Sequence, residues 1–130
     1  MNITKIKVVF EDNRGSIADI FYKTNINHIA IINSRAHAIR GNHYHKESTQ
    51  HLFVIKGSLR YYSKDVNDNK DKIKSIIVHE SEMVTTPPFE VHAMEMLEDN
   101  RCMVFTEGLR GGKDYEKDTF RVDPPLIKKK

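Results

Sequence analysis

The stretch from Arg40 to Gly57 constrains the fold more than any other part of the sequence, because it joins a histidine pair to an apolar strand. His43 and His45 lie two residues apart, so on an extended strand both imidazoles point to the same face. Gln50 follows after four residues, and the apolar run Leu52–Ile55 is typical of a core strand. Gly57, at the end of the stretch, supplies a turn. The stretch therefore predicts two imidazoles on one side of a sheet.

Short apolar or alternating segments fill the rest of the chain, and turn residues such as Asp12–Gly15 and Glu98–Asn100 separate them at near-regular intervals. No segment shows the apolar period of about 3.6 residues that an amphipathic helix requires. The predicted strands lie near Lys5–Phe10, Ser16–Ile20, His28–Ile32, Ala36–Ile39, Leu59–Tyr62, Ile73–Val78, Met83–Thr85, His92–Leu97 and Arg101–Thr106, with an edge strand within Asp114–Val122. About ten short strands avoid exposed edges by closing on themselves, so we predict an all-β jelly-roll barrel with little or no helix.

The size and composition of the chain fit one soluble domain. Its 130 residues can bury roughly two thirds of the surface that the unfolded chain exposes. We place the domain at residues 1–124 and a basic tail at residues 125–130. No apolar run approaches the ~20 residues of a membrane span, and Glu11 and Asp12 interrupt the N-terminal segment before a secretory signal forms. Cys102 is the only cysteine, so we expect a cytoplasmic protein without an intrachain disulfide.

The net charge of +3 does not indicate a nucleic-acid-binding protein. Part of the positive surplus comes from Lys128–Lys130, a terminal run of a kind that is usually solvated. A basic pocket for a phosphorylated small molecule stays open, because one or two arginines are sufficient to bind a phosphate group.

A second segment with a histidine begins 35 residues after Gln50 and reads TTPPFEVH from Thr85 to His92. Its proline pair fixes a bend. Together the two segments resemble the two motifs of the cupin superfamily, in which H-x-H, an acid or glutamine, and a late histidine line the mouth of a small β-barrel. The resemblance implies a site formed by His43, His45, Gln50 and His92. Gln50 and Phe89 stand where the family usually has a glutamate and a glycine.

Within this superfamily, several short segments resemble enzymes that modify nucleotide-linked 4-keto-6-deoxysugars. The run Glu11–Ser16 and the H-Y-H-K of His43–Lys46 are similar to segments of dTDP-4-keto-6-deoxyglucose 3,4-ketoisomerases. Arg40–Tyr44 is similar to the R-G-x-H-Y of dTDP-4-dehydrorhamnose 3,5-epimerases, and KDYEKDTFRV near the C-terminus resembles capsule-biosynthesis cupins with a zinc-binding H-x-H site. The resemblance implies an isomerase or epimerase of surface-polysaccharide sugar biosynthesis that forms a homodimer.

The chemistry of a 4-keto sugar explains the use of these residue types. The carbonyl acidifies the hydrogen on carbon 3, so one base can form an enediolate without a redox cofactor. His43 and His45 are the candidate bases, because an imidazole titrates at about pH 6.5. The candidate acids are Tyr44, Tyr61, Tyr62 and Tyr115, although on a regular strand Tyr44 faces away from both histidines. The predicted substrate-binding residues are Arg14, Arg40, Lys46, Arg60 and Tyr62.

A second class of function uses the same histidines. Three imidazoles and a glutamine can hold a zinc, nickel, manganese or iron ion, so the alternative prediction is a metal-binding cupin that does not act on sugar nucleotides. Such a protein would be a binding module or a metal-dependent oxygenase. Nucleoside diphosphates distinguish the classes, because they should stabilise only a sugar-nucleotide enzyme. The isolated His28, His37 and His79 are predicted to be structural, and His51 faces opposite to Gln50.

Overall fold

The computed structural model describes residues 2–67, 72–114 and 116–128, and its regular structure is almost entirely β-strand. The one helical element in these residues is the 3-10 turn η1 (Gly112–Asp114), and no helix there is long and apolar enough to cross a membrane. The described residues contain twelve strands where about ten were expected: β1 (Asn2–Lys5), β2 (Val8–Asp12), β3 (Gly15–Ala18), β4 (His28–Ser34), β5 (Ile39–Tyr44), β6 (Thr49–Lys56), β7 (Leu59–Asp65), β8 (Lys74–Val78), β9 (Glu82–Thr86), β10 (Glu90–Met96), β11 (Asn100–Glu107) and β12 (Phe120–Arg121).

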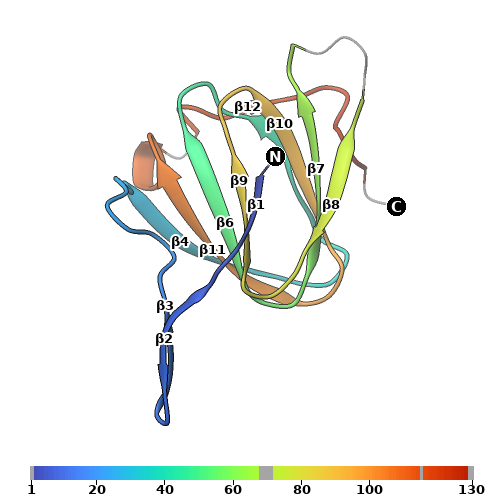
Figure 1. Cartoon of the computed structure of the whole chain (residues 1–130). Coiled ribbons are helices and arrows are strands. Elements are labelled where there is room, and N and C mark those ends of the chain that lie inside the picture. Colours follow the sequence, from blue (N-terminus) through green and yellow to red (C-terminus); the bar gives the residue numbers. More distant parts are fainter. Residues whose placement is uncertain (1, 68–71, 115, 129–130) are drawn as a thin grey trace.

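Ten of these strands form two five-stranded sheets that face each other (Figure 1). One sheet has the order β1-β9-β6-β11-β4 and is called the β6 sheet here, and the other has the order β12-β5-β10-β7-β8 and is called the β10 sheet. All strand pairs in them are antiparallel, and most neighbours in space are distant in sequence. This arrangement is a jelly roll, so the predicted fold class is confirmed.

Alternate side chains of both sheets point inward and form the core. In β6 the alternation buries Leu52 and Val54, and in β7 it buries Leu59 and Tyr61. Such branched and aromatic side chains pack well on a pleated surface. The buried cluster consists of Leu52, Val54, Leu59, Tyr61, Val78, Val84, Met94, Met96, Cys102 and Val104. It draws on strands of both sheets and therefore holds the two layers together.

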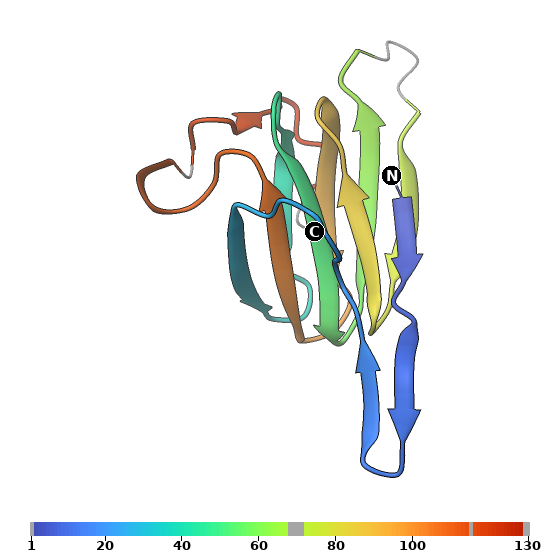
Figure 2. The ribbon, with the colours of Figure 1, turned by 60° about the vertical axis from the view of Figure 1, so that its left-hand side comes forward.

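The predicted N-terminal hairpin forms from β2 and β3, but it projects away from the barrel (Figure 2). Every residue of β3 is exposed. Val9, Phe10 and Ile17 have accessible fractions of 59%, 51% and 58%. The alternation of the hairpin therefore places apolar side chains in solvent and not in the core of this chain.

Residues 19–27, called the strap here, run from the hairpin across the outer face of the β6 sheet. The Phe21 ring packs edge-on against the rings of His51 and Phe105, with centroids 4.9 Å apart in both pairs. At the end of the strap, the backbone N–H of Asn27 donates to the carbonyl of Thr106 at 2.9 Å. The strap therefore covers the part of the outer face of the β6 sheet that lies around His51 and Phe105.

The C-terminal segment lies along the edge of the β10 sheet. The predicted edge strand at residues 114–122 is reduced to the two residues of β12, which pairs with β5. Farther along, the Asn42 amide donates to the Ile127 carbonyl at 3.1 Å and accepts the Ile127 N–H at 3.0 Å. The first part of the segment predicted to be a tail is therefore attached to the barrel.

Candidate functional site

An irregularity in β5 positions the first motif histidine. Gly41 and Asn42 have φ values of 93° and 62°, and the pairing of β5 with β10 shifts at this point, with His43 opposite His92. A Cβ atom on Gly41 would lie 2.8 Å from the carbonyl oxygen of His92, so the bulge needs glycine. The extra residue lets Arg40 and His43, three positions apart, line the same cavity.

His43, His45 and His92 converge inside the barrel. One nitrogen of each ring lies within 4.8 Å of the others, and the three ring centroids are 4.6–5.3 Å apart. His45 and His92 are buried, whereas His43 is half-buried. Three nitrogens this close share a centre within about 3 Å of each, and small side-chain rotations would bring them to the roughly 2.0–2.1 Å of zinc–nitrogen bonds. The predicted histidine cluster therefore has the geometry of a shared site.

Backbone carbonyls orient two of these rings. Nδ1 of His45 lies 2.7 Å from the carbonyl oxygen of Asp118, and Nδ1 of His92 lies 3.2 Å from that of Glu90. A carbonyl oxygen can only accept, so each Nδ1 carries the hydrogen and donates it. Nε2 of His45 is buried and has no hydrogen-bond partner among the described residues. Such a lone pair is suited to a metal ion or to a proton.

The Asp118 carboxylate holds the loop that follows His45. Its oxygens accept the backbone N–H groups of Lys46, Glu47 and Ser48 at 2.8–3.3 Å. Burial raises the pKa of the Asp118 carboxyl, but these hydrogen bonds outweigh burial and lower the pKa below its ordinary value. Asp118 therefore stays ionised and ties the C-terminal segment to the histidine site.

The three imidazoles are neutral at physiological pH. Burial is the main cause of a pKa of about 2 for His43, to which His92 and His45 contribute as well. Burial is also the main cause of a pKa of about 4 for His92, where the hydrogen bond to the Glu90 carbonyl raises the pKa and the His45 ring lowers it. Burial also lowers the pKa of His45, although the hydrogen bond to the Asp118 carbonyl raises it. A histidine must be neutral to bind a metal, so the environment of the cluster favours ligation.

Gln50 completes the donor set from β6. Gln50 is buried, and its Nε2 has no hydrogen-bond partner among the described residues. Its side chain favours the protonated form of His45 and so raises the pKa of His45. Three neutral imidazoles and an amide oxygen are ligands that suit zinc, nickel or iron. The residues present therefore fit a divalent metal, which His43, His45 and His92 would hold with Gln50 beside them.

A cavity of about 200 Å³ lies next to the histidines, between the two sheets. Apolar side chains such as Ile32 and Val104 form much of its wall. Its charged residues, among those that the structure describes, are Arg40 and Arg110, and no carboxylate contributes to its wall. With neutral histidines the cavity is therefore positive, which suits an anionic ligand.

Tyr61 is the candidate acid that the structure brings to this cavity. Its hydroxyl donates to the Glu90 carboxylate at 2.7 Å and lies 2.6 Å from the Thr86 hydroxyl, and its ring stacks on His92. Burial and then the Glu90 charge raise the pKa of Tyr61 above its ordinary value, so the hydroxyl keeps its proton. Tyr44 instead stacks on Phe120 and does not line the cavity, as strand alternation indicated. Tyr115 lies outside the described residues.

Of the five predicted substrate-binding residues, Arg40 alone lines the cavity. Arg60 and Tyr62 alternate with the buried residues of β7, so both point away from the barrel interior. Arg14 lies at the tip of the projecting hairpin, where it pairs with Asp12 at 2.6 Å. Lys46 follows His45, but its Nζ lies 4.3 Å above the Phe120 ring. The structure does not bring these four residues to the cavity.

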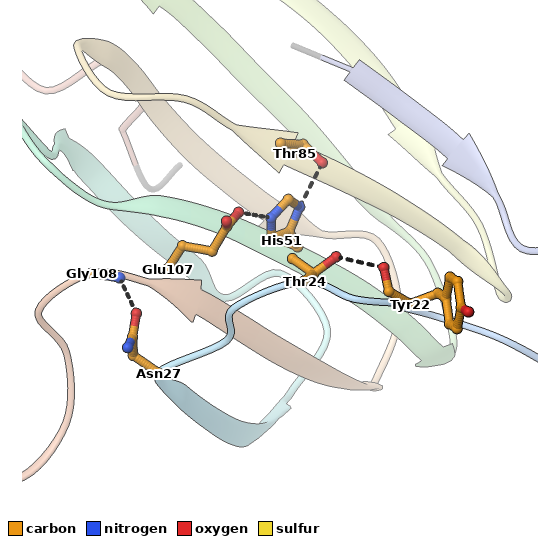
Figure 3. A network of polar contacts seen from close by, with 7 residues as sticks. All are labelled: Tyr22, Thr24, Asn27, His51, Thr85, Glu107 and Gly108. Atoms are coloured by element: carbon orange, nitrogen blue, oxygen red, sulfur yellow. Dashed lines mark hydrogen bonds and ion pairs between the residues drawn. The ribbon is translucent and has the colours of Figure 1, made fainter.

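Three residues with a place at the site were missed by the sequence analysis. His28 was predicted to be structural but lines the cavity, Arg110 reaches the cavity from the loop after β11, and Asp118 orients His45. The sequence did contain a signal for Arg110: the glycines at 108, 111 and 112 around it mark a tight loop. His51 lies on the outer face, where it bonds Thr85 and Glu107 (Figure 3).

The jelly roll and the histidine cluster inside it define a cupin-type barrel with a candidate metal or proton-transfer site. A family model described as the polysaccharide biosynthesis C-terminal domain matches residues 10–119, and the chain belongs to this family. No curated protein matches the sequence significantly.

The chain also shares its fold with solved structures of known proteins. dTDP-4-dehydrorhamnose 3,5-epimerase from Sulfolobus tokodaii is 24% identical, with a TM-score of 0.78 over 97% of this chain and 78% of that chain. QdtA, a sugar 3,4-ketoisomerase from Thermoanaerobacterium thermosaccharolyticum in complex with TDP, is 21% identical, with a TM-score of 0.75 over 94% and 88%. The capsular polysaccharide assembling protein CapF from Staphylococcus aureus is 21% identical, with a TM-score of 0.66 over 90% of this chain and 32% of CapF.

Proposed function

We propose that the protein is an isomerase or epimerase of a nucleotide-linked 4-keto-6-deoxysugar in surface-polysaccharide biosynthesis. The observation that carries the proposal is the convergence of three neutral imidazoles, two of them buried and one half-buried, beside a cavity whose described charged residues are both arginines. Neutral imidazoles can accept a proton or hold a metal, and a positive cavity suits a reaction that passes through an anion. The family and the structural relatives named above support this class.

In the proposed reaction, an imidazole removes the hydrogen from carbon 3, and the electron pair of that C–H bond forms an enediolate with the carbonyl at carbon 4. His43 and His45 are the candidate bases: His43 is the most accessible of the three, and His45 offers the Nε2 lone pair. A proton that returns to the opposite face of carbon 3 gives the epimer. A proton that returns to carbon 4, with loss of the hydroxyl proton at carbon 3, gives the 3-keto isomer. Tyr61 is the candidate donor.

A base with a lowered pKa has a small driving force for proton abstraction, so the carbonyl needs polarisation as well. A divalent metal would supply that polarisation as a Lewis acid, and only an imidazole that does not ligate it could then be the base. Backbone carbonyls orient His45 and His92, and this orientation suits metal binding, because such contacts fix the ligand nitrogens of metal-binding histidines.

The second candidate function is a metal-binding cupin that does not act on sugar nucleotides, and the donor set of three imidazoles and Gln50 favours it. We expect the purified protein to carry about one divalent ion per chain, and elemental analysis measures it. His92→Ala should lose the ion, whereas His79→Ala, at an exposed histidine outside the cluster, should retain it. An unmodified protein that binds no divalent ion, even after exposure to zinc, nickel, manganese and iron, would contradict the metal site and leave the histidines as acid–base groups.

We also propose that the active form is a homodimer. The projecting hairpin exposes Val9, Phe10 and Ile17 in solvent, and a second copy could bury them. Burial of apolar surface is favourable, and two-fold association of identical chains is the commonest way for a soluble protein to obtain it.

The test of the proposed function is incubation with a nucleotide-linked 4-keto-6-deoxyglucose in deuterated water, followed by NMR. We expect deuterium to enter the sugar at carbon 3, and also at carbon 4 if the protein is a ketoisomerase. Nucleoside diphosphates should also stabilise the folded protein, by about 2.7 kcal/mol at 100 times the dissociation constant. If neither exchange nor stabilisation is observed, the proposal fails and the second candidate is favoured.

A further inference from the structure

Arg110 lies in the loop between β11 and η1 and lines the cavity beside His28 and His43. We propose that Arg110 binds the oxygen that carries the negative charge of the enediolate. The assignment rests on the proposed function, because it concerns the intermediate of that reaction.

The guanidinium of Arg110 lies at the histidine end of the cavity. Its Nη1 donates to the hydroxyl of Thr119 at 3.0 Å, and the carbonyl of the preceding Asp118 accepts from Nδ1 of His45 at 2.7 Å. Arg110 also lines the same cavity as His43 and His92. These contacts place Arg110 near the carbonyl of a sugar held against the histidines.

The other cavity arginine is anchored at the opposite end of β4. Arg40 donates from Nε to the Ser34 hydroxyl at 2.8 Å and from Nη2 to the Asn33 carbonyl at 3.2 Å. The loop of Arg110 instead packs against His28 at the start of β4, six residues away or about 20 Å along a strand. The two arginines therefore serve different parts of an anionic substrate, and Arg40 is the candidate for the distant diphosphate.

Two glycines allow the Arg110 loop to approach the barrel. Gly108 has a φ of 126°, and a Cβ on it would lie 2.7 Å from the Ser48 hydroxyl. Gly111 has a φ of 88°, and a Cβ on it would overlap the ring of His28. Neither position accepts a side chain without movement of its neighbours, so the loop is built to lie close against the cavity wall.

Hydrogen bonds fix both ends of the loop. At its start, the Gly108 N–H donates to the Asn27 side chain of the strap at 2.9 Å, and the preceding Glu107 bonds His51 at 2.7 Å (Figure 3). At the other side, Nη1 of Arg110 donates to the Thr119 hydroxyl at 3.0 Å. Thr119 follows Asp118, whose carbonyl orients His45. The same segment thus positions both the guanidinium and one imidazole.

A guanidinium held in this way suits the stabilisation of a developing oxyanion. It is planar, it stays charged at every working pH, and it can present more than one N–H to an oxygen. A donor that is already in place needs no reorganisation when the charge forms, and loss of one such donor typically lowers the rate by roughly 10²–10³-fold.

The test compares Arg110→Ala and Arg110→Lys with the matched control Arg101→Ala. Arg101 is exposed on β11, bonds the Asn33 side chain and does not line the cavity, so its loss removes an equal charge and one hydrogen bond away from the site. Each variant is assayed for its kcat and KM for deuterium exchange, for its affinity for a nucleoside diphosphate, for metal content and for thermal unfolding. We expect Arg110→Ala to lower kcat by roughly 10²–10³-fold with diphosphate affinity changed less than about threefold. Arg110→Lys should recover part of the rate, and Arg101→Ala should match the unmodified protein.

Other outcomes overturn the assignment in distinguishable ways. If Arg110→Ala loses diphosphate affinity and keeps its kcat, Arg110 anchors the nucleotide and does not contact the enediolate. An unchanged rate and affinity would remove Arg110 from the site. If Arg110→Ala unfolds or loses metal, Arg110→Lys carries the test, and a lysine variant that is folded, metal-loaded and fully active refutes the need for the guanidinium. Absence of exchange in the unmodified protein overturns the proposed function itself, and this assignment with it.

Discussion

His43→Asn is expected to lower deuterium exchange at carbon 3 of the sugar by roughly 10²–10⁴-fold, the usual contribution of a general base. Asparagine keeps some hydrogen bonding but cannot accept the proton. His43 is half-buried and not part of the apolar core, so the fold should remain. Nucleoside diphosphate affinity should survive, because the arginines that suit phosphate are unchanged. NMR exchange rates and calorimetric binding measure the two effects separately.

Metal content must be measured on each histidine variant, because loss of a ligand empties a metal site and lowers activity for a different reason. His79→Asn is the matched control, since this histidine is exposed and outside the cluster. The decisive variant is His43→Asn combined with His45→Asn. If the double variant exchanges deuterium at the rate of the unmodified protein, neither histidine is the base, and His92 becomes the candidate.

Gly41→Ala is expected to destabilise the protein by about 2–5 kcal/mol. A positive φ costs a non-glycine residue about 1–2 kcal/mol, and overpacking adds roughly 1–3 kcal/mol. Here the new Cβ would meet backbone atoms of β10, at 2.8 Å from the His92 carbonyl oxygen and 3.1 Å from the Ala93 Cα. Neither atom can move without displacing the strand that carries His92, so exchange activity should fall together with stability. Denaturant unfolding measures the free energy.

Gly112→Ala is the matched control for this effect. Gly112 also has a positive φ, 50°, but a Cβ there has no heavy atom within 4 Å. We expect this change to cost only the conformational strain of about 1–2 kcal/mol. If Gly41→Ala costs no more than Gly112→Ala, then close approach of β5 and β10 is not what requires glycine at the bulge.

The sequence alone determined the elements that depend on local pattern. Period-two alternation and turn residues identified most of the strands that form the two sheets, because side-chain direction in a strand repeats every second residue. The strand β1 was not predicted, and the strand expected at Ala36–Ile39 begins only at Ile39. The spacing of His43 and His45 placed two imidazoles on one face, and in the structure His92 lies beside them. Alternation also indicated that Tyr44 faces away from His43 and His45, and the stacking of Tyr44 on Phe120 agrees with this.

Only the tertiary structure decided which distant residues meet at the site. Arg60 and Tyr62 are close to the motifs in sequence but alternate outward on β7, whereas Arg110 and Asp118 come from the end of the chain. The bulge at Gly41 and Asn42, which lets Arg40 and His43 share a cavity, depends on the register between β5 and β10. The lowered pKa values of the histidines arise from burial between two sheets. Register, closure and burial are set by contacts between segments far apart in the chain, so local pattern does not specify them.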